Sequence, residues 1–140
     1  MDNTQLVGPG TRVGLLHLVA PVQARPDESL GVVAGRMTDA GLSLAVLSGP
    51  GEPAVVSERD LVRALAEGLG PESPVGPVAT RHPVVVAADT SLRAAADLML
   101  AQSVRHLLVV DSGGRPVGVL SAREALRTLL RTASPDWGDS

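Results

Sequence analysis

The sequence predicts an α/β (α+β) fold made of two βαββα repeats. The chain has 140 residues, 44% of them hydrophobic and 19% charged, which is a globular composition. It repeats itself at a shift of 62 residues, because PDESL at 26–30 aligns with ADTSL at 88–92. One repeat of about 50 residues is too small to bury a sufficient core. We therefore expect the repeats to pack sheet to sheet with pseudo-two-fold symmetry.

An apolar stripe predicts the first helix of each repeat. Its residues follow the spacing i, i+3, i+4, i+7 of an amphipathic helix. In the first copy they are Leu30, Val33, Ala34 and Met37, and in the second copy they are Leu92, Ala95, Ala96 and Met99. Two helices with one pattern at one spacing indicate a duplicated structural unit.

Short apolar runs predict the strands on either side of these helices. The runs are 21–25, 42–47, 83–87 and 104–110. A Gly/Pro turn then leads to AVVSERDL at 54–61 and to GVLSAREAL at 118–126, each predicting a strand that runs into a second helix. The shift is 64 at this point, because the second copy has two extra residues around its turn.

The repeat and the Pro/Gly-rich segment GLGPESPVGP at 68–77 suggest the domain boundaries. We expect repeat 1 at 13–68, a linker at 69–77 and repeat 2 at 78–133. Residues 1–12 and 134–140 are expected to be tails.

Composition and spacing exclude several classes of protein. The net charge of −3 argues against a surface for nucleic acid or for anionic membrane. No apolar run approaches the ~20 residues of a membrane span, and the start of the chain does not resemble a signal peptide. There is no cysteine, and His17, His82 and His106 lack the spacing of metal ligands. We expect a cytoplasmic bacterial protein that is not an enzyme.

The predicted second helices begin with SERD and SARE, a serine followed three residues later by an acid. This is the pattern of a helix N-cap, and Ser-x-x-Glu is the capping box itself. A helix N-terminus also attracts anions, and a carboxylate can accept hydrogen bonds from two neighbouring hydroxyls. Ser57, Asp60, Ser121 and Glu124 are therefore candidates both for caps and for ligand contacts.

The duplicated βαββα order, with VRHLLVVDSGGRPVGVLSAREAL in the second copy, resembles a tandem cystathionine β-synthase (CBS) domain pair, or Bateman module. The resemblance covers residues 13–133. The first copy departs from it in having a shorter turn, Ala54 where the second copy has Gly118, and Ser43-Leu44 in place of a basic pair. The resemblance implies a stand-alone regulatory module that requires no cofactor. Many such pairs bind AMP, ADP, ATP or S-adenosylmethionine in the clefts between the two copies.

The resemblance also implies roles for individual residues. Ser57 would lie near phosphate and Asp60 would hold the ribose hydroxyls; Ser121 and Glu124 are their counterparts, with glutamate in place of aspartate. Arg105 and His106 match the basic pair that contacts phosphate in nucleotide-binding relatives. The segment before the first strand of the second copy would line the adenine pocket with Thr80, Arg81, His82 and Pro83. One cleft can take its ribose contacts from one copy and its phosphate contacts from the other.

Two functional hypotheses follow. In the first, the module binds an adenine nucleotide, forms a homodimer through its helices and signals to an unknown effector protein by a conformational or oligomeric change. In the second, it is a ligand-free module for interaction or assembly, with the fold retained and the site degenerate. Both hypotheses exclude nucleic acid and membrane as partners.

Overall fold

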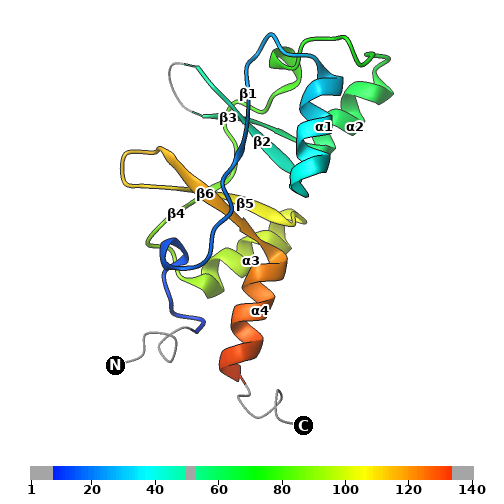
Figure 1. Cartoon of the computed structure of the whole chain (residues 1–140). Coiled ribbons are helices and arrows are strands. Elements are labelled where there is room, and N and C mark those ends of the chain that lie inside the picture. Colours follow the sequence, from blue (N-terminus) through cyan, green and yellow to red (C-terminus); the bar gives the residue numbers. More distant parts are fainter. Residues whose placement is uncertain (1–7, 50–52, 134–140) are drawn as a thin grey trace. The chain divides into compact units, whose positions relative to one another are not determined.

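The computed structural model describes residues 8–49 and 53–133, and within them the βαββα order occurs twice (Figure 1). The first copy comprises β1 (Val22–Ala24), α1 (Leu30–Ala40), β2 (Leu44–Leu47), β3 (Ala54–Ser57) and α2 (Glu58–Ala66). The second comprises β4 (Val85–Ala87), α3 (Leu92–Gln102), β5 (His106–Val110), β6 (Pro116–Ser121) and α4 (Ala122–Ala133). The predicted α+β fold class is thereby confirmed.

The strands form two separate sheets, ordered β1-β2-β3 and β4-β5-β6. In each sheet the first two strands run parallel, because an α-helix returns the chain to the start of the sheet between them. The strands β2 and β3 are antiparallel, with Leu44 opposite Ser57 and Leu47 opposite Ala54. This register places the end of β3, and therefore the start of α2, at one end of its sheet.

The described residues group into two compact units that differ from the two sequential repeats. One unit contains 20–49, 53–84 and 114–116, and the other contains 8–19, 85–113 and 117–133. The segment after α2 thus belongs with the first sheet, and the segment before β1 belongs with the second. The expected packing of one sheet on the other stays a prediction, as do the repeat boundaries.

Each unit has its own aliphatic core around the predicted stripe. The core of the first sheet contains Ala24, Leu30, Val33, Met37, Ala45, Leu47, Ala54, Val56, Ala64 and Val75. That of the second contains Val13, Val86, Leu92, Ala95, Met99, Leu107, Val109, Leu120 and Ala125. Both methionines of the stripe are buried, so they serve as packing residues.

The predicted linker packs against the first sheet's unit. Val75 is fully buried in that core, and its N–H donates to the Glu28 carbonyl at 2.8 Å. The N–H of Gly76 donates to the Pro26 carbonyl at 2.9 Å. A Cβ on Gly76 would lie 3.0 Å from the Pro26 Cβ, so glycine allows these two segments of the backbone to approach closely. These contacts lead the chain to the position of Thr80.

The segment before β1 is fixed on the second unit in the same way. Val13 is fully buried, and its N–H donates to the Thr90 carbonyl at 2.8 Å. The Thr11 carbonyl accepts from the Leu92 N–H at 2.8 Å, at the start of α3. Residues 8–12, expected to lie in a tail, therefore pack as part of this unit, whereas residues 1–7 and 134–140 lie outside the described residues.

Arg36 connects α1 to Glu28, in the segment before the helix, and to β1. The Arg36 guanidinium donates to the Glu28 carboxylate and, at 3.2 Å, to the Gln23 carbonyl. The hydrogen bonds from Arg36 and from the Arg25 N–H lower the pKa of Glu28 from 4.5 to about 2. The charged carboxylate is thus favoured in the folded state.

We expect this pair to stabilise the fold at neutral pH and to lose its effect in acid. Because the folded-state pKa of Glu28 is lowered, its contribution is complete above the unfolded-state value and disappears as the pH falls toward about 2. Glu28→Gln should therefore lower the melting temperature at pH 7 and leave a shallower decline between pH 5 and pH 2 than the wild type has. Parallel declines in thermal melts recorded across that range would contradict the assignment.

Thr128 carries a buried hydroxyl in α4. The residue is fully buried, and its Oγ1 has no hydrogen-bond partner among the described residues. The repeat aligns it with Ala64, an apolar residue of the other core. A buried hydroxyl without a partner costs free energy.

Thr128→Val keeps the shape of the side chain and removes this hydroxyl. We expect the free energy of unfolding to rise by about 1 kcal/mol, measured by urea denaturation. A loss of stability would show instead that the hydroxyl is hydrogen-bonded in solution.

Candidate functional site

The start of α2 carries a buried carboxylate. Ser57 is the N-cap of this helix, and its Oγ accepts a hydrogen bond from the Asp60 N–H at 3.1 Å. In return, Oδ2 of Asp60 accepts from the Ser57 N–H at 2.9 Å. The Asp60 residue is only 3% exposed. The predicted Ser-x-x-acid cap is therefore confirmed, and it is a complete capping box.

Thr80 reaches this carboxylate from the segment that comes after α2. Its backbone pairs with Val55 of β3 through hydrogen bonds of 2.7 and 3.0 Å, which fix its position two residues before Ser57 on the sheet. Its hydroxyl lies 3.1 Å from Oδ2 and 3.2 Å from Oδ1 of Asp60. The structure thus brings together three of the predicted site residues: Ser57, Asp60 and Thr80.

Arg63 closes the cluster on its outer side. Its guanidinium donates to Oδ1 of Asp60, and its side chain is 54% exposed. This residue was not among the predicted site residues, although its i, i+3 spacing from Asp60 is typical of helical ion pairs. Ser57, Asp60, Arg63 and Thr80 are called the Asp60 cluster below.

Some of the hydrogen-bond donors to the Asp60 carboxylate can be exchanged for donors of a ligand. Both carboxylate oxygens accept hydrogen bonds, and they lie beside the N-terminus of a helix, where negative charge is stabilised. The Ser57 N–H is fixed by the backbone. The Thr80 hydroxyl can rotate, and the exposed Arg63 side chain can move. A ligand with two neighbouring hydroxyl groups could therefore replace these two donors on Asp60.

The second unit has a counterpart at the start of α4. The Ser121 Oγ accepts from the Glu124 N–H at 3.0 Å, and the Glu124 carboxylate lies 3.6 Å from the Arg127 guanidinium. The position of Thr80 is taken by Val19, whose backbone pairs with Val119 of β6 through hydrogen bonds of 2.7 and 3.0 Å. The predicted pair Ser121 and Glu124 therefore lies together at a helix start.

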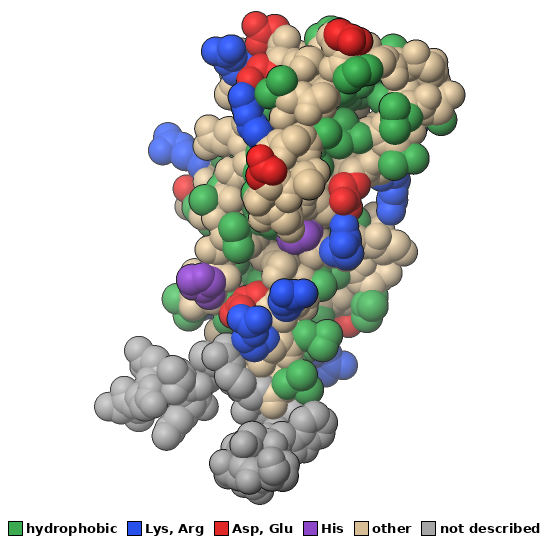
Figure 2. Space-filling view, turned by 45° about the vertical axis from the view of Figure 1, so that its right-hand side comes forward, with side chains coloured by type: hydrophobic (Ala, Val, Ile, Leu, Met, Phe, Trp, Pro, Cys, Tyr) green, Lys and Arg blue, Asp and Glu red, His purple; other side chains and the backbone are tan. Residues whose placement is uncertain are grey.

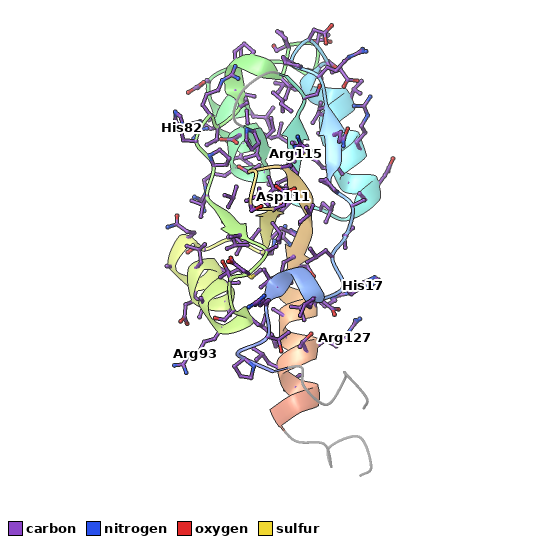
Figure 3. The ribbon with its side chains drawn as sticks, turned by 90° about the vertical axis from the view of Figure 1, so that its left-hand side faces the viewer. His17, His82, Arg93, Asp111, Arg115 and Arg127 are labelled. Carbon is purple, nitrogen blue, oxygen red and sulfur yellow. The ribbon has the colours of Figure 1, made fainter. Side chains whose placement is uncertain are left out.

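The predicted basic residues lie in two places. Arg105 is exposed just before β5, and its carbonyl accepts a hydrogen bond of 2.8 Å from the Ala122 N–H at the start of α4. His106 is the first residue of β5 and is half-buried. Arg81 and His82 are exposed between Thr80 and β4. His82 is labelled in Figure 3. Pro83, in the same segment, is half-buried. Arg105 and His106 belong to the compact unit that contains β5, and Thr80 to Pro83 belong to the other.

No group of three or more His, Asp or Glu side chains in 8–49 and 53–133 could hold a metal ion. Within the same ranges, no helix is both long enough and apolar enough to cross a membrane. Basic and acidic side chains are interspersed on the face drawn in Figure 2.

Comparison with known proteins decides the family. The family model of the CBS domain matches residues 75–131. The solved structure of a CBS domain protein from Pyrobaculum aerophilum, complexed with AMP, is 35% identical to this chain. The match has a TM-score of 0.74 and covers 88% of this chain and 98% of that one. The chain belongs to the CBS domain family. The resemblance to a tandem CBS pair is thereby confirmed.

Two further relatives extend the comparison with this CBS protein. An uncharacterized 17.7 kDa protein from Acidianus ambivalens is 29% identical over 130 residues, which are 91% of this chain and 79% of the relative. The CBS domain pair of protein MJ0100, solved with 5′-methylthioadenosine and S-adenosylmethionine, is 20% identical with a TM-score of 0.70. That match covers 84% of this chain and 98% of the other, and it shows a shared fold.

Proposed function

We propose that this CBS protein is a regulatory module that binds an adenosine-containing nucleotide, such as AMP, ADP, ATP or S-adenosylmethionine, through the Asp60 cluster. The observation that carries the proposal is the buried Asp60 carboxylate, held at a helix N-terminus beside the Thr80 hydroxyl. The relative from Pyrobaculum aerophilum, solved with AMP, supports an adenine nucleotide as the ligand.

In this proposal the ribose hydroxyls donate to Asp60 in place of Thr80 and Arg63. The Ser57 N–H keeps its hydrogen bond, so the start of α2 stays intact. The Ser57 hydroxyl lies on the phosphate side. Arg105 and His106, which belong to the other unit, stay predicted phosphate contacts that the family resemblance implies. The segment Arg81, His82 and Pro83 faces the base.

The same exchange supplies a regulatory signal. Without a ligand, Asp60 joins α2 to the segment after it through Thr80. A ribose that takes over the carboxylate releases Thr80 and Arg63, so ligand binding alters one contact between α2 and the segment after it and one contact within α2. We propose that this change alters packing or assembly and that an effector protein detects it. The module itself performs no catalysis.

We also propose that a second copy of the chain covers the groove between α3 and α4. This groove has a volume of about 360 Å³ and is lined mainly by apolar side chains, among them Met99, Leu100, Ala125, Leu126 and Leu129. Leu100 is 79% exposed. In a two-fold dimer the same patch meets itself, so an apolar groove is matched by an apolar partner. Leu100→Glu should then shift the mass in sedimentation equilibrium from dimer to monomer; an unchanged mass would contradict this interface.

The alternative function is a ligand-free module for assembly. It is favoured by the fact that Asp60 already has polar partners in Ser57, Thr80 and Arg63, as a purely structural cap would. In that case the Asp60 cluster only stabilises the start of α2.

A thermal-shift screen separates the two functions. A ligand at 100 times its Kd should stabilise the folded protein by about 2.7 kcal/mol. We expect such a shift with at least one of AMP, ADP, ATP and S-adenosylmethionine, and its loss in Asp60→Asn. Asp97→Asn, an exposed residue of α3, is the matched control and should keep the shift. A flat response of the folded wild type to all four ligands would support the assembly module.

A further inference from the structure

We propose that residues 8–14 can be exchanged between two copies of this chain, so that those of one copy dock on the other. Their receptor is the surface at the start of α3, formed by Ala88, Thr90, Leu92 and Arg93. Such an exchange concerns assembly and is independent of nucleotide binding. It follows from a sequence motif that occurs twice and packs in the same way each time.

The motif is Gly-Pro-x-Ser/Thr-x-Val-Gly. It occurs as GPGTRVG at 8–14 and as GPESPVG at 70–76, at the shift of 62 that relates the two repeats. Each occurrence comes before the first strand of its own repeat, so we call 8–14 the first leader and 70–76 the second leader. The duplicated structural unit therefore includes a leader.

Each leader caps the first helix of the other repeat. Its backbone carbonyls accept hydrogen bonds from the first two N–H groups of that helix, which have no partner within the helix itself. The pairs, donor first, are Arg93–Pro9 at 2.9 Å and Leu92–Thr11 at 2.8 Å for the first leader, and Gly31–Pro71 at 3.0 Å and Leu30–Ser73 at 2.9 Å for the second. The first leader thus caps α3, and the second leader caps α1.

Two further backbone hydrogen bonds and a buried valine hold each leader in place. The Val13 N–H donates to the Thr90 carbonyl at 2.8 Å, and the Val13 side chain is fully buried in the core. The Gly14 N–H donates to the Ala88 carbonyl at 2.8 Å. The second leader repeats both hydrogen bonds at the positions 62 residues along, with Val75 as its buried side chain.

The covalent connection from the first leader to its own repeat takes no part in these contacts. Val19 still pairs with Val119 of β6, and β1 begins at Val22, so residues 20–21 form the connection. The partners of the first leader all belong to the second unit. A leader from a second copy of the chain therefore offers the same hydrogen bonds and the same buried valine, which is the condition for domain swapping. Within one chain the tether gives the leader an effective concentration of roughly millimolar.

Gly14 and Ala88 offer a way to direct the exchange. A Cβ on Gly14 would lie 2.8 Å from the Ala88 Cβ and 3.0 Å from the Ala88 carbonyl oxygen. Gly14→Ala therefore overfills this contact, and Ala88→Gly removes the nearer of the two opposing atoms. A chain with only one of these substitutions has a leader that does not match its receptor. If two such chains exchange leaders, the substituted leader meets the substituted receptor and the natural leader meets the natural receptor.

Thermal melts of the full chain test the contact itself. Gly14→Ala should lower the melting temperature by about 5 °C, because the leader can no longer pack closely. Adding Ala88→Gly to the same chain should restore at least half of this loss. No recovery in the double variant would overturn the inference, since the leader and its receptor would not meet as described.

Co-expression of the two single variants tests the exchange. The Gly14→Ala chain carries an affinity tag, and both chains carry Leu100→Glu so that the proposed interface between α3 and α4 is absent. We expect the untagged Ala88→Gly chain to be recovered with the tagged chain in equal amount. The complex should have twice the mass of one chain in sedimentation equilibrium.

In the matched control, the untagged chain carries Asp97→Asn, at an exposed position of α3, in place of Ala88→Gly. Its receptor still opposes the substituted leader, so little of this chain should be recovered. Recovery of neither untagged chain, or of both in equal amount, would overturn the exchange between copies. Neither of those results bears on the thermal shift with adenosine ligands, which tests the proposed function separately.

Discussion

Gly118→Ala is expected to lower the free energy of unfolding by about 2–3 kcal/mol, a large loss for the addition of one methyl group. The added Cβ would lie 2.6 Å from the Leu18 Cβ and 3.1 Å from its Cδ1, well inside van der Waals contact. Leu18 has little freedom to withdraw, because the adjacent Val19 is hydrogen-bonded to Val119 in both directions. Urea denaturation measures the loss.

The other unit indicates how this loss can be reversed. There the equivalent positions are Ala54 and Ala79, so two alanines fit where Gly118 and Leu18 lie. Adding Leu18→Ala to Gly118→Ala should therefore cost less than the sum of the two single substitutions. Strictly additive losses would show that Gly118 and Leu18 are not in the contact described.

Asp60→Ala is expected to lower the free energy of unfolding by about 2–4 kcal/mol, combining a lost cap of about 1 with unmatched buried groups of about 1–3. The substitution removes one half of the capping box with Ser57 and leaves the Thr80 hydroxyl and Arg63 without this partner. The loss should be visible in urea denaturation.

Asp97→Ala is the control for this measurement. Asp97 is an exposed aspartate on α3, and its replacement should change the stability by no more than about 0.5 kcal/mol. Equal stabilities of the two variants would mean that the hydrogen bonds around Asp60 do not stabilise α2.

Much of the fold could be predicted from the repeat, since helices and strands with a regular apolar pattern occur twice. The ends of the strands were less predictable. The run at 104–110 begins its strand only at His106, because Ser103 ends α3 in the left-handed conformation and the chain must then turn into the sheet. The packing of the segments before β1 and after α2 could not be predicted either. Each segment places one valine, Val13 or Val75, in a core, and a single apolar residue forms no periodic pattern that can be recognised in the sequence.

The candidate site was partly predictable for a similar reason. Ser57 and Asp60 are close in sequence, so their spacing alone indicated a capped helix. That Thr80 meets Asp60 depends on the pairing of Thr80 with Val55, which is a tertiary contact. A shift of 62 aligns Thr80 with Leu18, whereas strand pairing makes Val19 its equivalent. The difference between the two units could therefore be seen only in the structure.

A crystal structure of this chain with AMP would show directly whether Asp60 holds the ribose. We expect both ribose hydroxyls within hydrogen-bond distance of the Asp60 carboxylate, with the Ser57 N–H still bound to Oδ2 and with Thr80 and Arg63 turned away from it. AMP bound at Glu124, or bound elsewhere while Asp60 keeps its contacts with Thr80 and Arg63, would contradict this assignment.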